Sequence, residues 1–364
     1  MKLLTYFLLF ISYLSLSAQN FDLIDATVDS AIADSIFPGA VILAGSSDNI
    51  IYQKAYGHYT YDKNSPEVTM ETMFDLASVT KAFGTNFCVM KLVDEGKLDI
   101  YAKVSKYLPD FAANGKENVR VIDLLIHESG LPAYYSPKPE ETREEIIDTI
   151  MALKLSYDTG TKMVYSCLNF VTTMLVVEAI TGEKMYKFYA ENFTGPLHMD
   201  HTMWNPGDDL KPECAPTQEL QGIVHDPLAR GLEGLSGNAG LFSTAGDLTK
   251  LCQLLLNKGT YEGVRYLKAS TIEKFTKRYS DLSTRAIGFD TRSDDGKASS
   301  GHYFHPGTYG HLGYTGTSIW IDPIADLFVI FLTNRVYPDD TASIRSTRPK
   351  VYDAVMIALG KDKE

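Results

Sequence analysis

The chain has 364 residues and a formal net charge of −12, with 34 lysines and arginines against 46 aspartates and glutamates. This acidic balance argues against nucleic acid as a partner, because phosphate binding needs clustered lysine and arginine. The four cysteines, at positions 88, 167, 214 and 252, show no C-x-x-C or Cys/His spacing, so the sequence implies no metal site, disulfide scaffold or organic cofactor.

The first 18 residues have the pattern of a signal peptide, with Lys2, an apolar run over residues 3–16 and the small residues Ser17 and Ala18. The run is shorter than the roughly 20 apolar residues of a membrane span, and there is no nearby cysteine that would indicate a lipid anchor. We therefore expect an exported protein, periplasmic or secreted, without a stable membrane anchor. Residues 19–364 contain no linker-like tract or repeat, so we expect one large domain with an inserted subdomain.

The remaining pattern predicts strands at both ends of this domain and helices between them. Apolar runs at residues 39–45 and 50–56 flank Ser-Ser-Asp-Asn, which is a β-hairpin signal. Helices are expected at residues 78–96, 121–127, 140–155, 168–180, 247–257 and 348–359, and short strands at residues 286–290, 317–321 and 327–333. The simplest arrangement is an α+β fold, with an antiparallel sheet from both termini flanked by helices and an all-helical insertion.

A candidate nucleophile stands in Ser78-Val-Thr-Lys81, since Ser78 is the one serine with a lysine three residues later. On a helix these positions share a face, so the lysine amine would lie beside the hydroxyl. A serine hydroxyl needs a base to remove its proton, and lysine serves as that base only if its pKa falls from about 10.4 towards about 7–8. The alternative is a solvated lysine near a helix cap, because S-x-x-K also arises by chance.

Four further blocks follow in order: Leu-Leu-Ile-His-Glu-Ser-Gly-Leu-Pro at 124–132, Gly-Thr-Lys-Met-Val-Tyr-Ser at 160–166, Gly-Asn-Ala-Gly-Leu-Phe-Ser-Thr at 237–244 and Gly-His-Leu-Gly-Tyr-Thr-Gly at 310–316. With Ser78 and Lys81 they resemble the serine β-lactamase and penicillin-binding-protein superfamily, in its class C-like and esterase-like branch. The resemblance covers nearly all of the mature chain and implies a β-lactamase/transpeptidase-like fold. No G-x-S-x-G, H-E-x-x-H or P-loop motif supports another class of enzyme.

The resemblance assigns roles position by position. Ser78 matches the nucleophile, Lys81 its base, and Tyr165 the tyrosine of the Y-x-N element, which relays protons. His311-Leu-Gly313 matches the K-T-G strand element, and the backbone N–H of Tyr314 would join that of Ser78 in the oxyanion hole. The alternatives are a core tyrosine at 165 and a structural strand histidine at 311.

Two departures from the family pattern bear on the substrate. Cys167 stands where Y-x-N has asparagine, so the amide that orients a β-lactam or peptide is lost, unless Asn169 supplies one from a turn away. His311-Leu312 replaces Lys-Thr, so a substrate carboxylate would meet a largely neutral imidazole and an apolar side chain. Both changes argue against an efficient β-lactamase or a standard D,D-carboxypeptidase, while the acylation machinery remains.

The block at 222–226, Gly-Ile-Val-His-Asp, is similar to a branch linked with cell-wall fragments, which includes amidases that release N-acetylmuramic acid from the stem peptide. The predicted function is therefore hydrolysis of a muropeptide amide through an acyl-enzyme, either N-acetylmuramoyl-L-alanine amidase-like or D-peptidase-like. The predicted substrate-binding residues are His311, Gly313, Cys167, Asn169 and His225. His127, and alternatively the His225-Asp226 pair, would only brace the scaffold. Rival functions are an esterase or weak β-lactamase, and a non-hydrolytic binder or sensor of cell-wall peptides.

Overall fold

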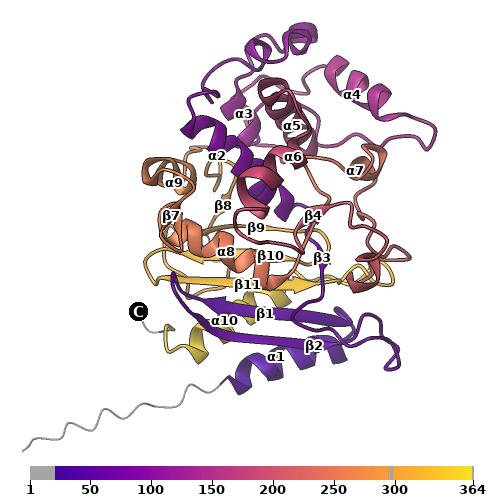
Figure 1. Ribbon diagram of the computed structural model, residues 1–364, viewed down its shortest axis with the longest axis vertical. Coiled ribbons are helices and arrows are strands. Elements are labelled where there is room, and N and C mark those ends of the chain that lie inside the picture. The colour runs from indigo at the N-terminus through magenta and orange to yellow at the C-terminus, as the bar shows by residue number, and fades with distance from the viewer. Residues whose placement is uncertain (1–20, 294, 296–297, 363–364) are drawn as a thin grey trace, which may run out of the picture.

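A six-stranded antiparallel sheet, built from both ends of the chain, forms the base of the molecule (Figure 1). The structure is a computed structural model and describes residues 21–293, 295 and 298–362. The predicted signal peptide, 1–18, lies outside these residues. The strands run in the order β2-β1-β11-β10-β9-β8, with bounds β1 Gly39–Gly45, β2 Ile50–Gly57, β8 Asp290–Thr291, β9 Tyr309–Leu312, β10 Ser318–Asp322 and β11 Leu327–Thr333.

Helices cover both faces of this sheet. Helices α1 (Asp22–Ala33) and α10 (Thr347–Ala358) lie against one face, and α8 (Ala245–Leu256) contacts β1 and β11 on the other (Figure 1). Along β1, Val41 and Leu43 enter one hydrophobic core while Ala40 and Ile42 enter the second. A strand covered on both faces needs apolar side chains at every position, which is why β1 and β11 are unbroken apolar runs.

The middle of the chain forms the helical region above the sheet (Figure 1). Its helices are the π-helix η1 (Lys81–Thr85), α2 (Asn86–Asp94), η2 (Val104–Lys106), η3 (Pro109–Gly115), α3 (Val121–Leu125), α4 (Arg143–Ala152), α5 (Cys167–Thr181), α6 (Met185–Tyr189), η4 (Ala190–Thr194), η5 (Lys211–Glu213) and α7 (Pro227–Gly231). There are also two small sheets among the described residues. One has three strands in the order β3 (Phe74–Asp75), β5 (Leu241–Ser243) and β4 (Met203–Trp204), and the other pairs β6 (Thr260–Tyr261) with β7 (Val264–Arg265). Helix α9 spans Ala269–Thr276. The expected α+β architecture, with its helical insertion, is confirmed.

One local expectation was wrong, and two features were not anticipated. The helix expected over 78–96 is present, but it includes a π-helical turn, in which Thr85 Oγ1 donates to the carbonyl of Gly237. Residues 286–289 do not form a strand, because Gly288 has φ +77° and lies against the side chain of Asn86, which binds the carbonyl of Ile287. Helix α1 was not anticipated.

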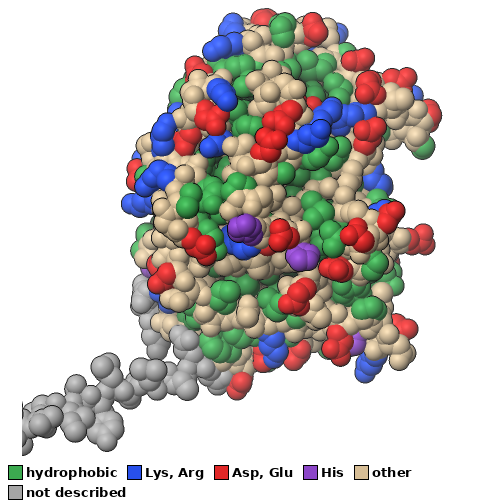
Figure 2. Space-filling view, in the orientation of Figure 1, with side chains coloured by type: hydrophobic (Ala, Val, Ile, Leu, Met, Phe, Trp, Pro, Cys, Tyr) green, Lys and Arg blue, Asp and Glu red, His purple; other side chains and the backbone are tan. Residues whose placement is uncertain are grey.

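The surface seen in Figure 2 has acidic and basic side chains interspersed, with no continuous basic stripe on that face. Among the described residues, no helix is long and apolar enough to cross a membrane.

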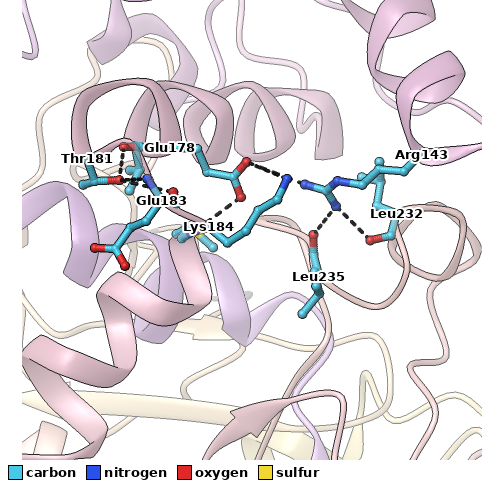
Figure 3. A network of polar contacts seen from close by, with 9 residues as sticks. Arg143, Glu178, Thr181, Glu183, Lys184, Leu232 and Leu235 are labelled. Carbon is cyan, nitrogen blue, oxygen red and sulfur yellow. Dashed lines mark hydrogen bonds and ion pairs between the residues drawn. The ribbon is translucent and has the colours of Figure 1, made fainter.

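A buried arginine ties the helical region together (Figure 3). Arg143 begins α4 and is 4% exposed. Its Nη1 donates to the carbonyls of Leu232 at 2.9 Å and Leu235 at 3.0 Å, and its Nη2 lies 3.7 Å from Glu178 on α5. The segment held in this way leads directly into residues 237–238, whose carbonyls accept hydrogen bonds from Thr85 and Lys81.

We predict that Arg143→Met lowers the free energy of unfolding by about 2–4 kcal/mol, because two carbonyls and the Glu178 carboxylate lose a partner in poorly hydrated surroundings. Urea denaturation followed by circular dichroism measures the change. The matched control is Lys184→Met, which removes the other cation beside Glu178; that side chain is 48% exposed and should matter by less than about 1 kcal/mol. Equal effects of the two substitutions would contradict the prediction.

Candidate active site

A cleft of about 580 Å³ lies beside the end of β9 and brings together most of the predicted site residues. Those that line it are Ser78, Tyr165, His311, Gly313 and Tyr314. They come from the turn after β3, the segment before α5, and the end of β9 with the turn that follows. The sheet and the helical region therefore each contribute one wall.

Ser78 lies in a sharp turn between β3 and the helical segment that contains η1. The preceding residue, Ala77, has φ +46°, a left-handed conformation that is unfavourable for a residue with a side chain. The carboxylate of Asp75 accepts the backbone N–H of Ala77 at 2.8 Å and stabilises this turn. Ser78 is half-buried, and its hydroxyl is directed to the cleft beside Lys81.

Lys81 is fully buried and its amine has three acceptors: Ser78 Oγ at 2.9 Å, the carbonyl of Asn238 at 2.8 Å and Cys167 Sγ at 3.6 Å. Burial by itself lowers the pKa of Lys81, but the negative charges that Cys167 and Tyr165 carry when ionised raise it above the ordinary value. The condition for Lys81 to be a free base near neutral pH, a lowered pKa, is therefore not met in the resting site. Lys81 rests as an ammonium with all three protons donated, and Tyr165 becomes a second candidate to accept the proton of Ser78.

The ring of Tyr165 is enclosed by cations and imidazoles. Lys81 Nζ lies 5.0 Å and Arg285 Cζ 5.4 Å from its centroid, and the rings of His127 and His311 lie at 4.4 and 6.2 Å. These contacts hold the Tyr165 ring beside Lys81, which makes its hydroxyl a candidate to exchange protons with Ser78 and the leaving group.

Asn169 does not line the cleft. It is fully buried, its Oδ1 accepts the hydroxyl of Ser129 at 2.6 Å, and its Nδ2 lies 3.2 Å from Nδ1 of His127. The same His127 nitrogen accepts the backbone N–H of Ser166, next to Tyr165. The prediction that the Asn169 amide contacts substrate does not fit this arrangement, in which both ends of the amide are occupied. The Asn169–His127 pair instead supports the segment that carries Tyr165.

The two backbone N–H groups expected to form an oxyanion hole are available. Neither Ser78 nor Tyr314 donates its N–H to an acceptor among the described residues, and both line the cleft. Gly313 brings them together: a Cβ there would lie 2.5 Å from the carbonyl of Leu76 and 2.1 Å from Thr317 Oγ1. Only glycine allows the end of β9 to approach the nucleophile turn so closely.

His311 is buried and neutral. Burial, and then the charge of Arg285, lower its pKa well below the ordinary value. Its Nδ1 lies 2.8 Å from the carbonyl of Leu312, so Nδ1 carries the proton and Nε2 is left as an acceptor. A neutral acceptor cannot anchor a carboxylate as the family lysine would.

Four arginines in the cleft were missed from the sequence: Arg285, Arg335, Arg345 and Arg348. Arg335 and Arg348 donate to backbone carbonyls. Arg285 is 12% exposed, lies 3.5 Å from Asp290, and has a buried Nε without a hydrogen-bond partner among the described residues. No motif could have found it, since it lies in an irregular segment and reaches Tyr165 only through the fold.

His225 does not line the cleft, but its ring stacks on that of Tyr314, which does, with centroids 5.7 Å apart. Asp226 caps α7 by accepting the N–H of Ala229 and also accepts from Asn238 Nδ2 at 3.1 Å. His225 thus contacts a residue of the cleft without lining it, and Asp226 braces its own turn. Among the described residues, no group of three or more His, Cys, Asp or Glu is placed to hold a metal ion, and the four cysteines are free and buried.

Comparisons with known proteins identify the family. Residues 24–351 match the Beta-lactamase family. N-acetylmuramyl-L-alanine amidase of Bacillus subtilis (strain 168) is 35% identical over 363 residues, covering 88% of this chain and 82% of that protein. A putative D-alanyl-D-alanine carboxypeptidase of Escherichia coli (strain K12) is 30% identical over 365 residues, covering 89% and 84%. The solved structure of EstCE1, a hydrolase with promiscuous acyltransferase activity, is similar in fold with TM-score 0.76 at 22% identity, covering 92% of this chain and 97% of that one.

The fold and the relatives define a serine hydrolase of the acyl-transfer type. The chain belongs to the Beta-lactamase family, as the order of its sequence blocks indicated.

We predict that Cys167→Ala shifts the pH dependence of kcat/KM to lower pH. In the wild type the raised pKa keeps Lys81 protonated near neutrality, so the fraction of free amine, and with it the rate, rises as pH increases. Removing the ionisable sulfur next to Lys81 lowers that pKa, and the rise should begin at a lower pH. The control is Cys252→Ala, a buried thiol in α8. Superimposable profiles for wild type and Cys167→Ala would contradict the prediction.

Proposed function

We propose that this protein cleaves a cell-wall muropeptide amide through an acyl-enzyme on Ser78, as an N-acetylmuramoyl-L-alanine amidase-like or D-peptidase-like hydrolase. The observation that carries the chemistry is the 2.9 Å contact between Lys81 Nζ and Ser78 Oγ. The cleft also holds Tyr165 and the backbone N–H groups of Ser78 and Tyr314, which have no acceptor within the described part of the chain. A nucleophile, a proton-transfer pair and an oxyanion site are the parts that acyl transfer needs.

In the proposed reaction, Ser78 Oγ attacks the amide carbonyl and its proton passes to the Tyr165–Lys81 pair. The N–H groups of Ser78 and Tyr314 donate to the oxygen of the tetrahedral intermediate. The C–N bond then breaks, and the leaving amine takes the proton that Ser78 lost. Water next attacks the ester, gives its proton to the same pair, and the acid is released as Ser78 regains its hydrogen.

Several features support a muropeptide rather than a β-lactam. The relative with 35% identity is named an N-acetylmuramyl-L-alanine amidase. Cys167 and the neutral His311 remove the amide and the lysine that would orient a β-lactam. Arg285, the second cation beside Tyr165 after Lys81, suits a leaving amine that carries a carboxylate, as a released free amino acid does. Such a substrate lies outside the cytoplasm, in agreement with the proposed signal peptide and export.

We predict that Ser78→Ala abolishes hydrolysis and leaves the fold intact, because the serine hydroxyl borders a cleft and fills no core position. Mass spectrometry after treatment with a fluorophosphonate should show one adduct, on Ser78. The control is Ser283→Ala, an alteration of a serine outside the cleft. Labelling of another serine, or undiminished turnover in Ser78→Ala, would overturn the assignment of the nucleophile.

We predict that the purified protein releases L-alanine from N-acetylmuramoyl-L-alanine and hydrolyses nitrocefin poorly, well below the roughly 10⁴–10⁸ M⁻¹s⁻¹ of good enzymes. Liquid chromatography of the products and absorbance of nitrocefin measure the two rates, with a D-Ala-D-Ala peptide and a p-nitrophenyl ester as further substrates. Fast ester hydrolysis with an untouched muramoyl amide would make the protein an esterase. Stable acylation without product release would make it a binder or sensor.

A further inference from the structure

Asp75 lies three residues before the nucleophile and carries a buried carboxylate. Each of its two oxygens accepts a hydrogen bond from a backbone N–H group. It is 2% exposed. One oxygen accepts the N–H of Ala77 at 2.8 Å and the other accepts the N–H of His225 at 2.7 Å, from a segment 150 residues away. No lysine or arginine within the described part of the chain forms an ion pair with it. The two N–H groups are therefore what stabilises its charge.

The first of these hydrogen bonds supports the nucleophile turn. Ala77 has φ +46°, a left-handed conformation that is unfavourable for a residue with a side chain. The hydrogen bond from its N–H to Asp75 offsets that cost, and Ser78 follows directly. The direction of the Ser78 hydroxyl, and of its backbone N–H, depends on this turn.

The second hydrogen bond holds the loop at the other side of the cleft. The ring of His225 stacks on Tyr314, whose N–H is the other candidate oxyanion donor. The neighbouring Asp226 accepts from Asn238 Nδ2, and the carbonyl of Asn238 accepts from Lys81 Nζ at 2.8 Å. Displacement of this loop would therefore move groups that contact Tyr314, at the oxyanion site, and Asn238, which binds Lys81.

We propose that Asp75 is a positioning residue that holds the nucleophile turn and the His225 loop together in the reactive arrangement, and that its protonation releases them. This inference rests on the proposed role of Ser78 and not on the identity of the substrate. Protonation removes the negative charge that strengthens both hydrogen bonds, and it turns one oxygen into a hydroxyl group, which is a much weaker acceptor. Both contacts then weaken, and the nucleophile turn and the His225 loop are no longer held in their relative positions.

The surroundings of Asp75 place its protonation at a pH close to neutrality. Burial raises the pKa of Asp75 to about 6, against the two backbone N–H groups that lower it; Asp226 adds to the rise and Arg230 opposes it. The nearby Cys214 thiol stays neutral, since burial raises its pKa to about 12, and burial lowers the pKa of the His225 imidazole. Asp75 is therefore ionised above about pH 6, and both hydrogen bonds weaken as the pH falls through that value.

The test measures the second-order rate of Ser78 labelling by a fluorophosphonate between pH 4.5 and 8, which needs no knowledge of the substrate. In addition to the gradual fall in rate that protonated Lys81 causes as the pH decreases, the wild type should show a further loss of reactivity with a midpoint near pH 6. Asp75→Asn should lower the rate at least tenfold at pH 7.5 and abolish the midpoint, because an amide offers one acceptor at every pH. His225→Gln keeps the backbone N–H and should keep the midpoint, which separates Asp75 from the imidazole.

Two further variants complete the test. Asp99→Asn alters an exposed aspartate that makes the same contact, to the N–H two residues on, and should leave the profile unchanged. Ala77→Gly relieves the left-handed strain, so its rate should fall less at pH 5, and this variant decides the matter if Asp75→Asn does not fold. A wild-type profile without a midpoint near pH 6, or the same profile in Asp75→Asn, overturns the inference. Failure of Ser78 to be labelled at all would instead refute the proposed nucleophile.

Discussion

The buried ammonium of Lys81 is the constraint on which the rest of the site depends. An uncompensated charge in a protein interior costs several kcal/mol, so its three protons need acceptors. They come from distant parts of the chain: Ser78 in the nucleophile turn, Cys167 at the start of α5, and the carbonyl of Asn238 before β5. Those three segments must all be docked before the charge is accommodated, and the docked arrangement is the one that places a base beside a hydroxyl.

Asp75 is the anionic counterpart of Lys81, and the two charges are stabilised in the same way. Each is buried, and each is bound mainly by groups of the backbone or by neutral side chains. A direct ion pair between them would have neutralised both and left Lys81 unavailable to Ser78. Keeping them apart leaves a cation next to the nucleophile and a carboxylate that holds the turn behind it.

The position of positive charge in the cleft bears on the proposed substrate. His311 is neutral and Leu312 is apolar, whereas Arg285 from a neighbouring segment brings a guanidinium over the Tyr165 ring. Guanidinium groups bind carboxylates through paired hydrogen bonds, so a change in its position alters which substrates are held in register with Ser78.

The sequence by itself determined the elements that depend on near neighbours: the β-hairpin around residues 46–49, the apolar strand at 327–333, and the Ser78–Lys81 pair, whose spacing of three residues suffices to bring the groups together. Only the tertiary structure decided that Asn169 turns inward to Ser129, and that Arg285 lies over Tyr165. It also decided the charge of Lys81, which follows from ionisable neighbours and not from apolar ones. Spacing governs what one turn of chain can do, whereas pKa values and hydrogen-bond partners depend on groups that folding brings in from far along the chain.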